Sequence, residues 1–172
     1  MRAFAIATIG AIGLGGCAMN DGTTTGSAAA VADLTTANGQ TVGRATASEV
    51  AGGVRVSVDG MNMPPGPHGA HVHTVGRCDA PTFESAGGHW NPTGRQHGTD
   101  NPAGPHAGDM PNLSVASDGR GALTFTLQGG TIDGLFDADG SAMMIHANAD
   151  DLRTDPSGNS GGRIACGVFR RG

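Results

Sequence analysis

The most regular feature of the chain is an alternation of apolar and polar positions with a period of two residues. In the segment GVRVSVDG (53–60), Val54, Val56 and Val58 alternate with polar residues, as in a strand that buries one face. After residue 28, no long stretch shows the 3.6-residue period of an amphipathic helix. The pattern predicts an all-β domain.

Further segments carry the same signal. One hairpin is expected in 30–50 around Asn38-Gly39, and a second in 112–129 around Asp118-Gly119, because such dipeptides favour tight turns between strands. The remaining strand segments are HGAHVH (68–73), SAMMIHAN (141–148) and RIACGVF (163–169). About eight short strands of this kind are typical of an antiparallel sandwich or barrel.

Two long segments do not fit a minimal barrel. Residues 74–111 and 147–162 lack a regular pattern and are rich in Gly. Long irregular loops within a compact domain usually carry function. Both loops adjoin histidines, which makes them the first place to look for a site.

The N-terminus has the features of a targeting segment. Residues 1–16 combine Arg2 with a short run of small and apolar residues, as in a signal peptide that is too short to span a bilayer. LGGC (14–17) resembles a bacterial lipobox, in which Cys17 becomes the lipidated first residue; the alternative is an ordinary cleaved signal. Residues 17–28 are then a lipidated cysteine and flexible tether, and 29–172 form the domain.

Charge and cysteine usage narrow the function further. The net charge of −5 argues against a general attraction to nucleic acid. Besides Cys17, the chain has two cysteines, Cys78 and Cys166. Because an exported chain meets an oxidising compartment, we expect these two to form a disulfide. The alternative is two buried thiols.

The first long loop gathers residues that bind metals. His89, His97, His106 and Asp109 follow one another at intervals of eight, nine and three residues. A loop rich in Gly and Pro has little core of its own, so four potential ligands suggest that a metal holds it together. Three imidazoles and a carboxylate suit tetrahedral zinc in a closed, structural site.

A second set of histidines lies on strands or at their ends. His71 and His73 are separated by two positions and so point to one face of a strand, and His146 ends another strand. Imidazole ligands without a thiolate suit copper or zinc. His68 is expected to face away from His71 and His73, and we interpret it as structural.

The combination of motifs resembles the copper/zinc superoxide dismutase family, of the bacterial exported type. The resemblance covers roughly residues 29–170. The motifs that carry it are HGAHVH (68–73), GGHWNPTGRQHG (87–98), HAGDMPNL (106–113), MIHANADD (144–151) and GGRIACGVF (161–169). It implies an eight-stranded antiparallel Greek-key barrel or sandwich, in agreement with the strand pattern.

The resemblance also implies a role for each matching residue. Four histidines match copper ligands: His71, His73, His89 and His146. Of these, His89 matches the histidine that bridges copper to zinc, and the other zinc ligands match His97, His106 and Asp109. Arg163 matches the arginine beside copper that attracts superoxide, Asp150 the carboxylate that links the two metal sites, and Cys78 and Cys166 the family disulfide.

The function implied is superoxide dismutation. The cofactors are copper and zinc, the substrate is superoxide, and Arg163 and His89 are the catalytic residues. Together with the lipobox, the resemblance places the enzyme in the periplasm as a monomer or homodimer, held by lipid to the outer membrane because Ala18, rather than Asp, follows the cysteine.

The chain departs from the family pattern in two places. Ala70 stands where a large apolar residue is usual, so we expect Met143 and Met144 to fill the space that it leaves in the barrel. The loop 147–162 is short and has few charges that could steer substrate, so Arg77 and Arg153 are candidates for that role.

Two other interpretations compete with the enzyme. A non-catalytic copper- or zinc-binding lipoprotein of the same fold would be expected to lack copper ligands or the arginine. A lipoprotein with a purely structural zinc loop would leave four residues without a purpose: His71, His73, His146 and Arg163. For Asp150 alone, the alternative is membership of a solvated acidic pair with Asp151.

Overall fold

The strand at 53–60 forms where apolar and polar residues alternate. The computed structural model describes residues 29–172, together with Met1. On β3 (Gly53–Gly60) the three valines are buried, while Arg55 and Asp59 are exposed. Each valine therefore points into the barrel, as the two-residue period predicts.

The described part of the chain forms one antiparallel sheet with very little helix. Its strands are β1 (Ala30–Thr35), β2 (Thr41–Val50), β3 (Gly53–Gly60), β4 (Gly66–His68), β5 (Ala70–His73), β6 (Leu113–Val115), β7 (Gly121–Gln128), β8 (Ala142–His146), β9 (Arg163–Val168) and β10 (Arg170–Arg171). The helices are η1 (Glu84–Ala86), a 3-10 turn, and α1 (Ile132–Leu135). Both expected hairpins are present, with Gly39 and Gly119 at positive φ in their turns.

The strands curl into a nearly closed barrel in the order β4-β6-β7-β3-β2-β1-β9-β8-β5, with β10 paired to β1. The all-β fold class is confirmed, but the sheet has ten strands rather than about eight. One additional strand is β10, and the other arises at HGAHVH, because β4 pairs with β6 whereas β5 pairs with β8. The single segment expected there is thus two strands, divided at Gly69.

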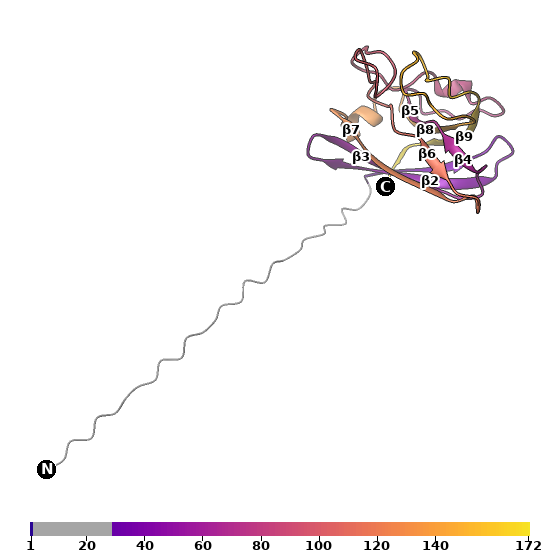
Figure 1. Ribbon diagram of the computed structural model, residues 1–172. Helices are drawn as coiled ribbons and strands as arrows, with labels where there is room; N and C mark the ends of the chain where they lie inside the picture. The colour runs from indigo at the N-terminus through magenta and orange to yellow at the C-terminus, as the bar shows by residue number, and fades with distance from the viewer. Residues whose placement is uncertain (2–28) are drawn as a thin grey trace.

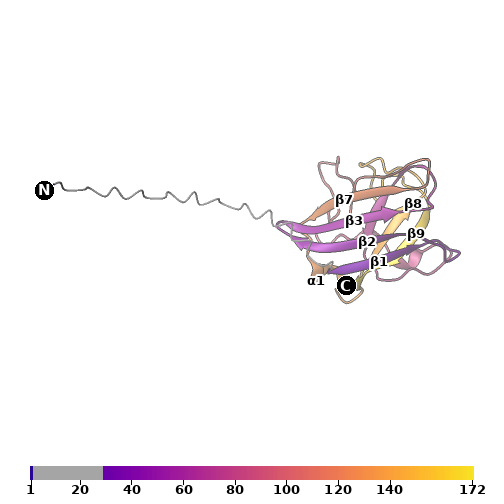
Figure 2. The same ribbon diagram turned by 90° about the horizontal axis from the view of Figure 1, so that it is seen from below.

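Both long loops lie at the same end of the barrel, which is the upper side of Figure 1. The loop 74–111 leaves β5 at one edge of the sheet and reaches β6 near the other edge, so it crosses the end of the barrel. The loop 147–162 joins the neighbouring strands β8 and β9. Figure 2 shows β1, β2, β3 and β7 side by side in the wall below these loops.

The core has a main cluster inside the barrel and a smaller one outside β8 and β9. Ala70 and Met143 both belong to the main cluster. Met144 instead packs with Phe83, Ala86 and Cys166 in the smaller cluster, beneath the first long loop. The expectation that both methionines fill the space beside Ala70 is therefore wrong for Met144, because adjacent residues on β8 point to opposite faces.

The two ends of the described domain lie together. Ala30 pairs with Arg171, and the backbone N–H of Gly172 donates to the carbonyl of Ala29. In Figure 1 the C-terminus lies below the barrel, on the side away from the two loops. The expected signal peptide (1–16) and the Cys17 tether (17–28) lie outside the described residues, except for Met1.

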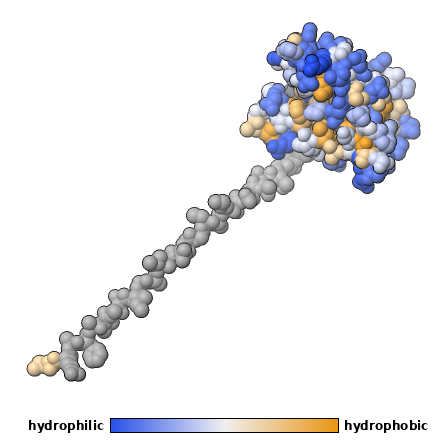
Figure 3. Space-filling model, viewed as in Figure 1, coloured by the Kyte–Doolittle hydropathy of each residue, from blue (hydrophilic) through white to orange (hydrophobic). Residues whose placement is uncertain are grey.

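The surface of the domain is mixed. On the face shown in Figure 3, hydrophilic residues predominate over the loop end, and apolar residues form small separate areas. Within the described residues, no helix has the length and apolar character needed to cross a bilayer.

Candidate metal centre

The centre forms where the free edge of β5 pairs with the first long loop. His73 forms a bridge with His89, and His71 forms one with Asp109. The backbone of Val72 supports both contacts, since its N–H donates to Gly108 and its carbonyl accepts from Trp90. Backbone pairing thus brings loop residues beside the histidines of β5.

One group of four imidazoles forms at this edge. His71 and His73 come from β5, His146 from the end of β8, and His89 from the loop. One ring nitrogen from each of the four lies within 4.8 Å of the others. The ring centroids of His71 and His89 are 4.0 Å apart. The sheet register explains part of this proximity, because β8 is the neighbour of β5.

The four inward nitrogens of this group are buried and have no hydrogen-bond partner among the described residues: His71 Nδ1, His73 Nε2, His89 Nε2 and His146 Nε2. A buried polar atom without a partner costs free energy, so four such atoms pointing at one place fit a bound metal ion. An all-imidazole set of this kind fits copper.

A second group combines three imidazoles with one carboxylate. Oδ1 of Asp109 lies 2.8 Å from Nδ1 of His89, 3.0 Å from Nδ1 of His97 and 3.3 Å from Nδ1 of His106. Zinc with bonds of about 2.0–2.1 Å in tetrahedral geometry needs ligand atoms about 3.3 Å apart. The spacing and the donor types therefore fit zinc.

His89 belongs to both groups. Its Nδ1 faces the carboxylate of Asp109, and its Nε2 faces the imidazole group. One ring between two sites can serve both metals only after losing both of its protons, which two cations together favour.

Asp150 connects the two groups by binding one histidine ring of each. Its Oδ2 accepts a hydrogen bond from Nε2 of His71 at 2.6 Å, and its Oδ1 accepts one from Nε2 of His97 at 3.0 Å. Asn112 holds the backbone of Asp150, since its side chain accepts from the N–H and donates to the carbonyl of that residue. Gly158 leaves room for it, since a Cβ there would overlap the carboxylate. Asp150 is buried and Asp151 is exposed, so the two do not form a solvated pair.

Burial and neighbouring charges shift the pKa values of these groups in different directions. Burial lowers the pKa of His73 to about 2, of His146 to about 3 and of His89 to about 4. Burial also opposes protonation of His97, but its hydrogen bonds to Asp109 and Asp150 outweigh burial and raise its pKa to about 9. Burial likewise opposes ionisation of Asp109 and Asp150, yet their histidine partners hold both pKa values below the usual range.

Arg163 stands at the mouth of the imidazole group. It lines a pocket of about 410 Å³ together with His73, His89, His146, Asn91 and Ser157. Its guanidinium donates to the carbonyls of Phe83 and Gly87, both at 2.6 Å. Among the described residues, neither Arg77 nor Arg153 lines this pocket, and Arg77 pairs with Asp79.

The disulfide anchors the part of the first long loop whose carbonyls accept hydrogen bonds from Arg163. Cys78 is bonded to Cys166 of β9, as expected, with Cα atoms 5.7 Å apart. The bond and the small cluster around Phe83 attach the first long loop to the sheet. The two carbonyls that fix Arg163 could not be identified from the sequence, because every residue has a carbonyl.

His68 lies outside both groups, in keeping with the structural interpretation. Its Nδ1 is 2.8 Å from the carbonyl oxygen of His146, and its Nε2 is 2.8 Å from that of Pro64. The ring thus joins the loop before β4 to the end of β8.

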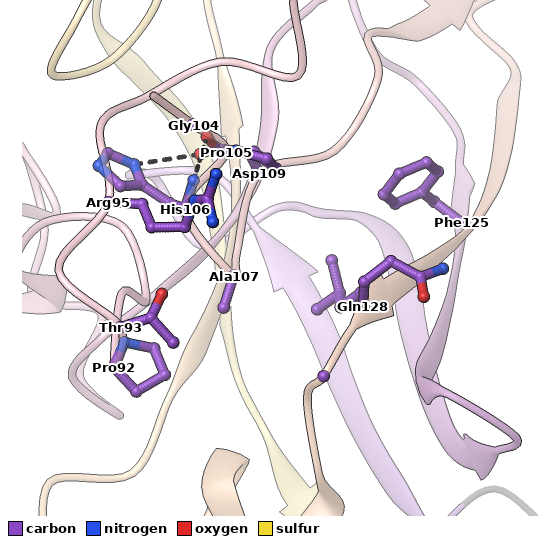
Figure 4. Close-up of a pocket in the computed structure, with 12 residues that line it drawn as sticks. Pro92, Thr93, Arg95, Gly104, Pro105, His106, Ala107, Asp109, Phe125 and Gln128 are labelled. Atoms are coloured by element: carbon purple, nitrogen blue, oxygen red, sulfur yellow. Dashed lines mark hydrogen bonds and ion pairs between the residues drawn. The ribbon is translucent and has the colours of Figure 1, made fainter. Parts of the chain in front are cut away.

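A separate pocket of about 340 Å³ adjoins the zinc-type group. Figure 4 shows His106 and Asp109 joined by dashed lines on one side, with Phe125 and Gln128 on the other. His106 therefore borders this pocket as well as the pocket at Arg163.

Comparison with known proteins agrees with this geometry. Residues 38–169 match the model of the copper/zinc superoxide dismutase family. The chain is 41% identical over 145 residues to copper/zinc superoxide dismutase 1 of Aquifex aeolicus, covering 81% of this chain and 86% of that one. It is 39% identical over 151 residues to the copper/zinc enzyme of Deinococcus radiodurans, covering 81% and 82%.

Solved structures show the same likeness. A superoxide dismutase-like protein from Bacillus subtilis superimposes with a TM-score of 0.76 at 39% identity, covering 80% of this chain and 96% of that one. The copper/zinc superoxide dismutase of Brucella abortus gives a TM-score of 0.65 at 27% identity, covering 80% and 97%.

Proposed function

Because the chain belongs to the copper/zinc superoxide dismutase family, we propose that it acts as an exported superoxide dismutase held to a membrane by a lipid on Cys17. The enzymatic part follows from the family and the site: the protein is a copper/zinc superoxide dismutase with intact copper and zinc sites. The observation that carries this conclusion is the convergence of four buried, unpartnered ring nitrogens beside Arg163.

We assign the residues to the metals by their donor atoms. Copper would be held by the four unpartnered nitrogens of His71, His73, His89 and His146. Zinc would be held by Asp109 and the Nδ1 atoms of His89, His97 and His106. His89 would then bridge the metals through its two ring nitrogens.

Bound copper supplies the one-electron chemistry that converts two superoxide ions and two protons into dioxygen and hydrogen peroxide. The protein attracts and guides the substrate with Arg163, since a fixed cation at a narrow mouth concentrates a small anion. Two carbonyls hold that guanidinium in place without neutralising its charge. Nε2 of His89 is the ring atom at which this chain could hold a proton for the product whenever that atom is not bound to copper.

The test combines metal content with activity. Protein loaded with both metals should contain one copper and one zinc per chain and should consume superoxide faster than the metal-stripped protein. Active protein that contains zinc alone would contradict the copper assignment. Loaded but inactive protein would favour the non-catalytic metal binder of the same fold.

The membrane attachment rests on the N-terminal sequence. A signal peptide in 1–16, the lipobox ending at Cys17 and a polar tether to residue 28 support a periplasmic enzyme anchored to the outer membrane. The described domain is compatible with this arrangement, because it begins on the side of the barrel away from the two loops.

Cys17→Ser tests the anchor. The variant should move from the membrane fraction to the soluble fraction and keep its superoxide dismutase activity. A wild-type protein that is already wholly soluble, with no change on substitution, would contradict the anchor. The proposal holds for a monomer and for a homodimer, which analytical centrifugation of the Cys17→Ser protein distinguishes.

A further inference from the structure

Metal-binding histidines in proteins usually donate a hydrogen bond from the ring nitrogen that faces away from the metal. Four ligand rings here follow this rule within the described residues. The outward nitrogens of His71 and His97 reach Asp150, and those of His73 and His146 reach the carbonyls of Gly87 and Gly161. His89 uses both of its nitrogens toward the metals.

His106 is the exception. Its Nδ1 faces Asp109, and its Nε2 lies 3.7 Å from Oδ1 of Asp155, which is longer than a hydrogen bond. The His106 side chain is only 9% exposed, and among the described residues no side chain or carbonyl accepts a hydrogen bond from its Nε2. Among the described residues, Asp155 is therefore the one carboxylate within ion-pair distance of this outward nitrogen.

Asp155 already contacts a second ligand. The same Oδ1 accepts a hydrogen bond from the backbone N–H of His97 at 2.6 Å. Asp155 belongs to the loop 147–162, whereas His97 and His106 belong to the loop 74–111. One carboxylate thus reaches across from one loop to two ligands of the zinc-type group.

We propose that Asp155 is a positioning residue for zinc, which orients His106 through its ring and His97 through its backbone. This inference rests on the zinc assignment made above. Asp150 contacts one ring of each metal group, while Asp155 contacts two ligands of the zinc group. Loss of the Asp155 charge should therefore weaken zinc and leave copper in place.

The expected effect is moderate. Substitution of a carboxylate that orients a metal ligand typically costs about 10–100-fold in metal affinity. The side chain of Asp155 is 49% exposed, so solvent screens its charge, and a loss near the lower limit, about 10-fold, is expected.

A purely structural role is the competing explanation, because other bonds also join the two loops. The N–H of Asp100 donates to the carbonyl of Leu152 at 3.0 Å, and Nδ2 of Asn101 lies 3.3 Å from the carbonyl of Arg153. Asn101 also donates to the carbonyl of His97 at 2.9 Å, and among the described residues it has no hydrogen bond to a ligand ring. Asn101→Ala is thus a matched control that loosens the same junction.

The experiment compares the full chain with Asp155→Asn and Asn101→Ala. Asp155→Asn keeps an oxygen for the His97 N–H and removes the charge beside His106. Chelator titrations should show zinc bound about 10-fold more weakly in Asp155→Asn, with copper affinity unchanged. Cobalt(II) placed at the zinc site should show an altered visible spectrum in Asp155→Asn and a wild-type spectrum in Asn101→Ala.

Two results would overturn the role of Asp155. One is an equal loss of zinc and the same cobalt spectrum in both variants, which would leave only a loop contact. The other is an equal loss of copper and zinc in Asp155→Asn. A wild-type chain that binds copper but no zinc would instead overturn the zinc assignment itself.

Discussion

The carboxylate of Asp150 lies 2.6 Å from Nε2 of His71, and both side chains are completely shielded from solvent. The hydrogen bond fixes the ring so that Nδ1, the other nitrogen, points at the copper group. The second oxygen of the carboxylate holds His97 in the same way on the zinc side. One buried anion therefore sets the orientation of a ligand at each metal.

Asp150→Asn should weaken both metal sites, because both rings lose the shared negative charge, and the site whose ring also loses its hydrogen bond should lose about 10–100-fold in affinity. An amide offers one acceptor oxygen, and its NH₂ group would face an N–H donor, so one of the two rings loses its partner. Chelator titration for each metal measures the effect. Asp151→Asn is the control, because Asp151 is exposed and binds only within its own loop. Equal, small losses from both variants would contradict the linking role.

Arg163→Ala should slow superoxide consumption and flatten its dependence on ionic strength, with both metals retained. The guanidinium is the cation that lines the pocket at the metals, and salt screens its attraction for the substrate. Rates measured across a salt series test this. Arg55→Ala, on the exposed face of β3, should change neither quantity. An unchanged rate at low salt in Arg163→Ala would remove the residue from substrate capture.

Glu84→Gln should have the opposite effect. Glu84 is exposed and lines a pocket together with Arg163, so its carboxylate opposes the field that attracts superoxide. Removing this charge should raise the rate at low salt by about two- to threefold, and the gain should vanish at high salt. Asp59→Asn, which removes an exposed charge on β3, is the matched control. Equal rates in Glu84→Gln and the wild type at low salt would contradict the effect.

Cys78→Ser should destabilise the protein and also impair Arg163. Loss of a native disulfide typically costs about 2–5 kcal/mol, which urea unfolding of the metal-loaded protein would measure. The carbonyls of Phe83 and Gly87 that fix Arg163 lie in the segment that follows Cys78, so the rate should fall at unchanged copper content. A rate that falls only in proportion to lost copper would show that the disulfide does not act through Arg163.

The metal-stripped protein should be most stable near pH 6.5. Below that pH the unfolded chain protonates its histidines, whereas burial holds the pKa of His73 at about 2, of His146 at about 3 and of His89 at about 4, so stability falls with pH. Each such group contributes up to about 1.4 kcal/mol per pH unit. Between pH 9 and 6.5, His97 binds a proton only in the folded state, so stability rises as the pH falls.

Thermal denaturation after chelation, measured from pH 5 to 9, tests this profile. The metal-loaded protein is the control and should not show the maximum, because its histidines are bound to metal rather than to protons. If the midpoint temperature of unfolding of the metal-stripped protein stays constant from pH 6.5 to 5, the predicted burial of neutral histidines is contradicted.

The sequence by itself determined the parts of this protein that depend on local pattern. Alternation with a period of two residues identified strands such as 53–60, because side chains on a strand take opposite faces in turn. The same rule placed His71 and His73 on one face. Family motifs gave the residue types of both metal groups and the Cys78–Cys166 pair, since these are properties of the chain that can be recognised without coordinates.

Only the tertiary structure decided which distant groups meet. The division at Gly69, the place of Met144 outside the barrel and the approach of Asp155 to His106 depend on sheet register and loop paths. The partners of Arg163 are backbone carbonyls, which no residue type reveals. Contacts between residues far apart in the sequence leave no periodic signal, because they are set by the balance of packing and hydrogen bonding over the whole barrel.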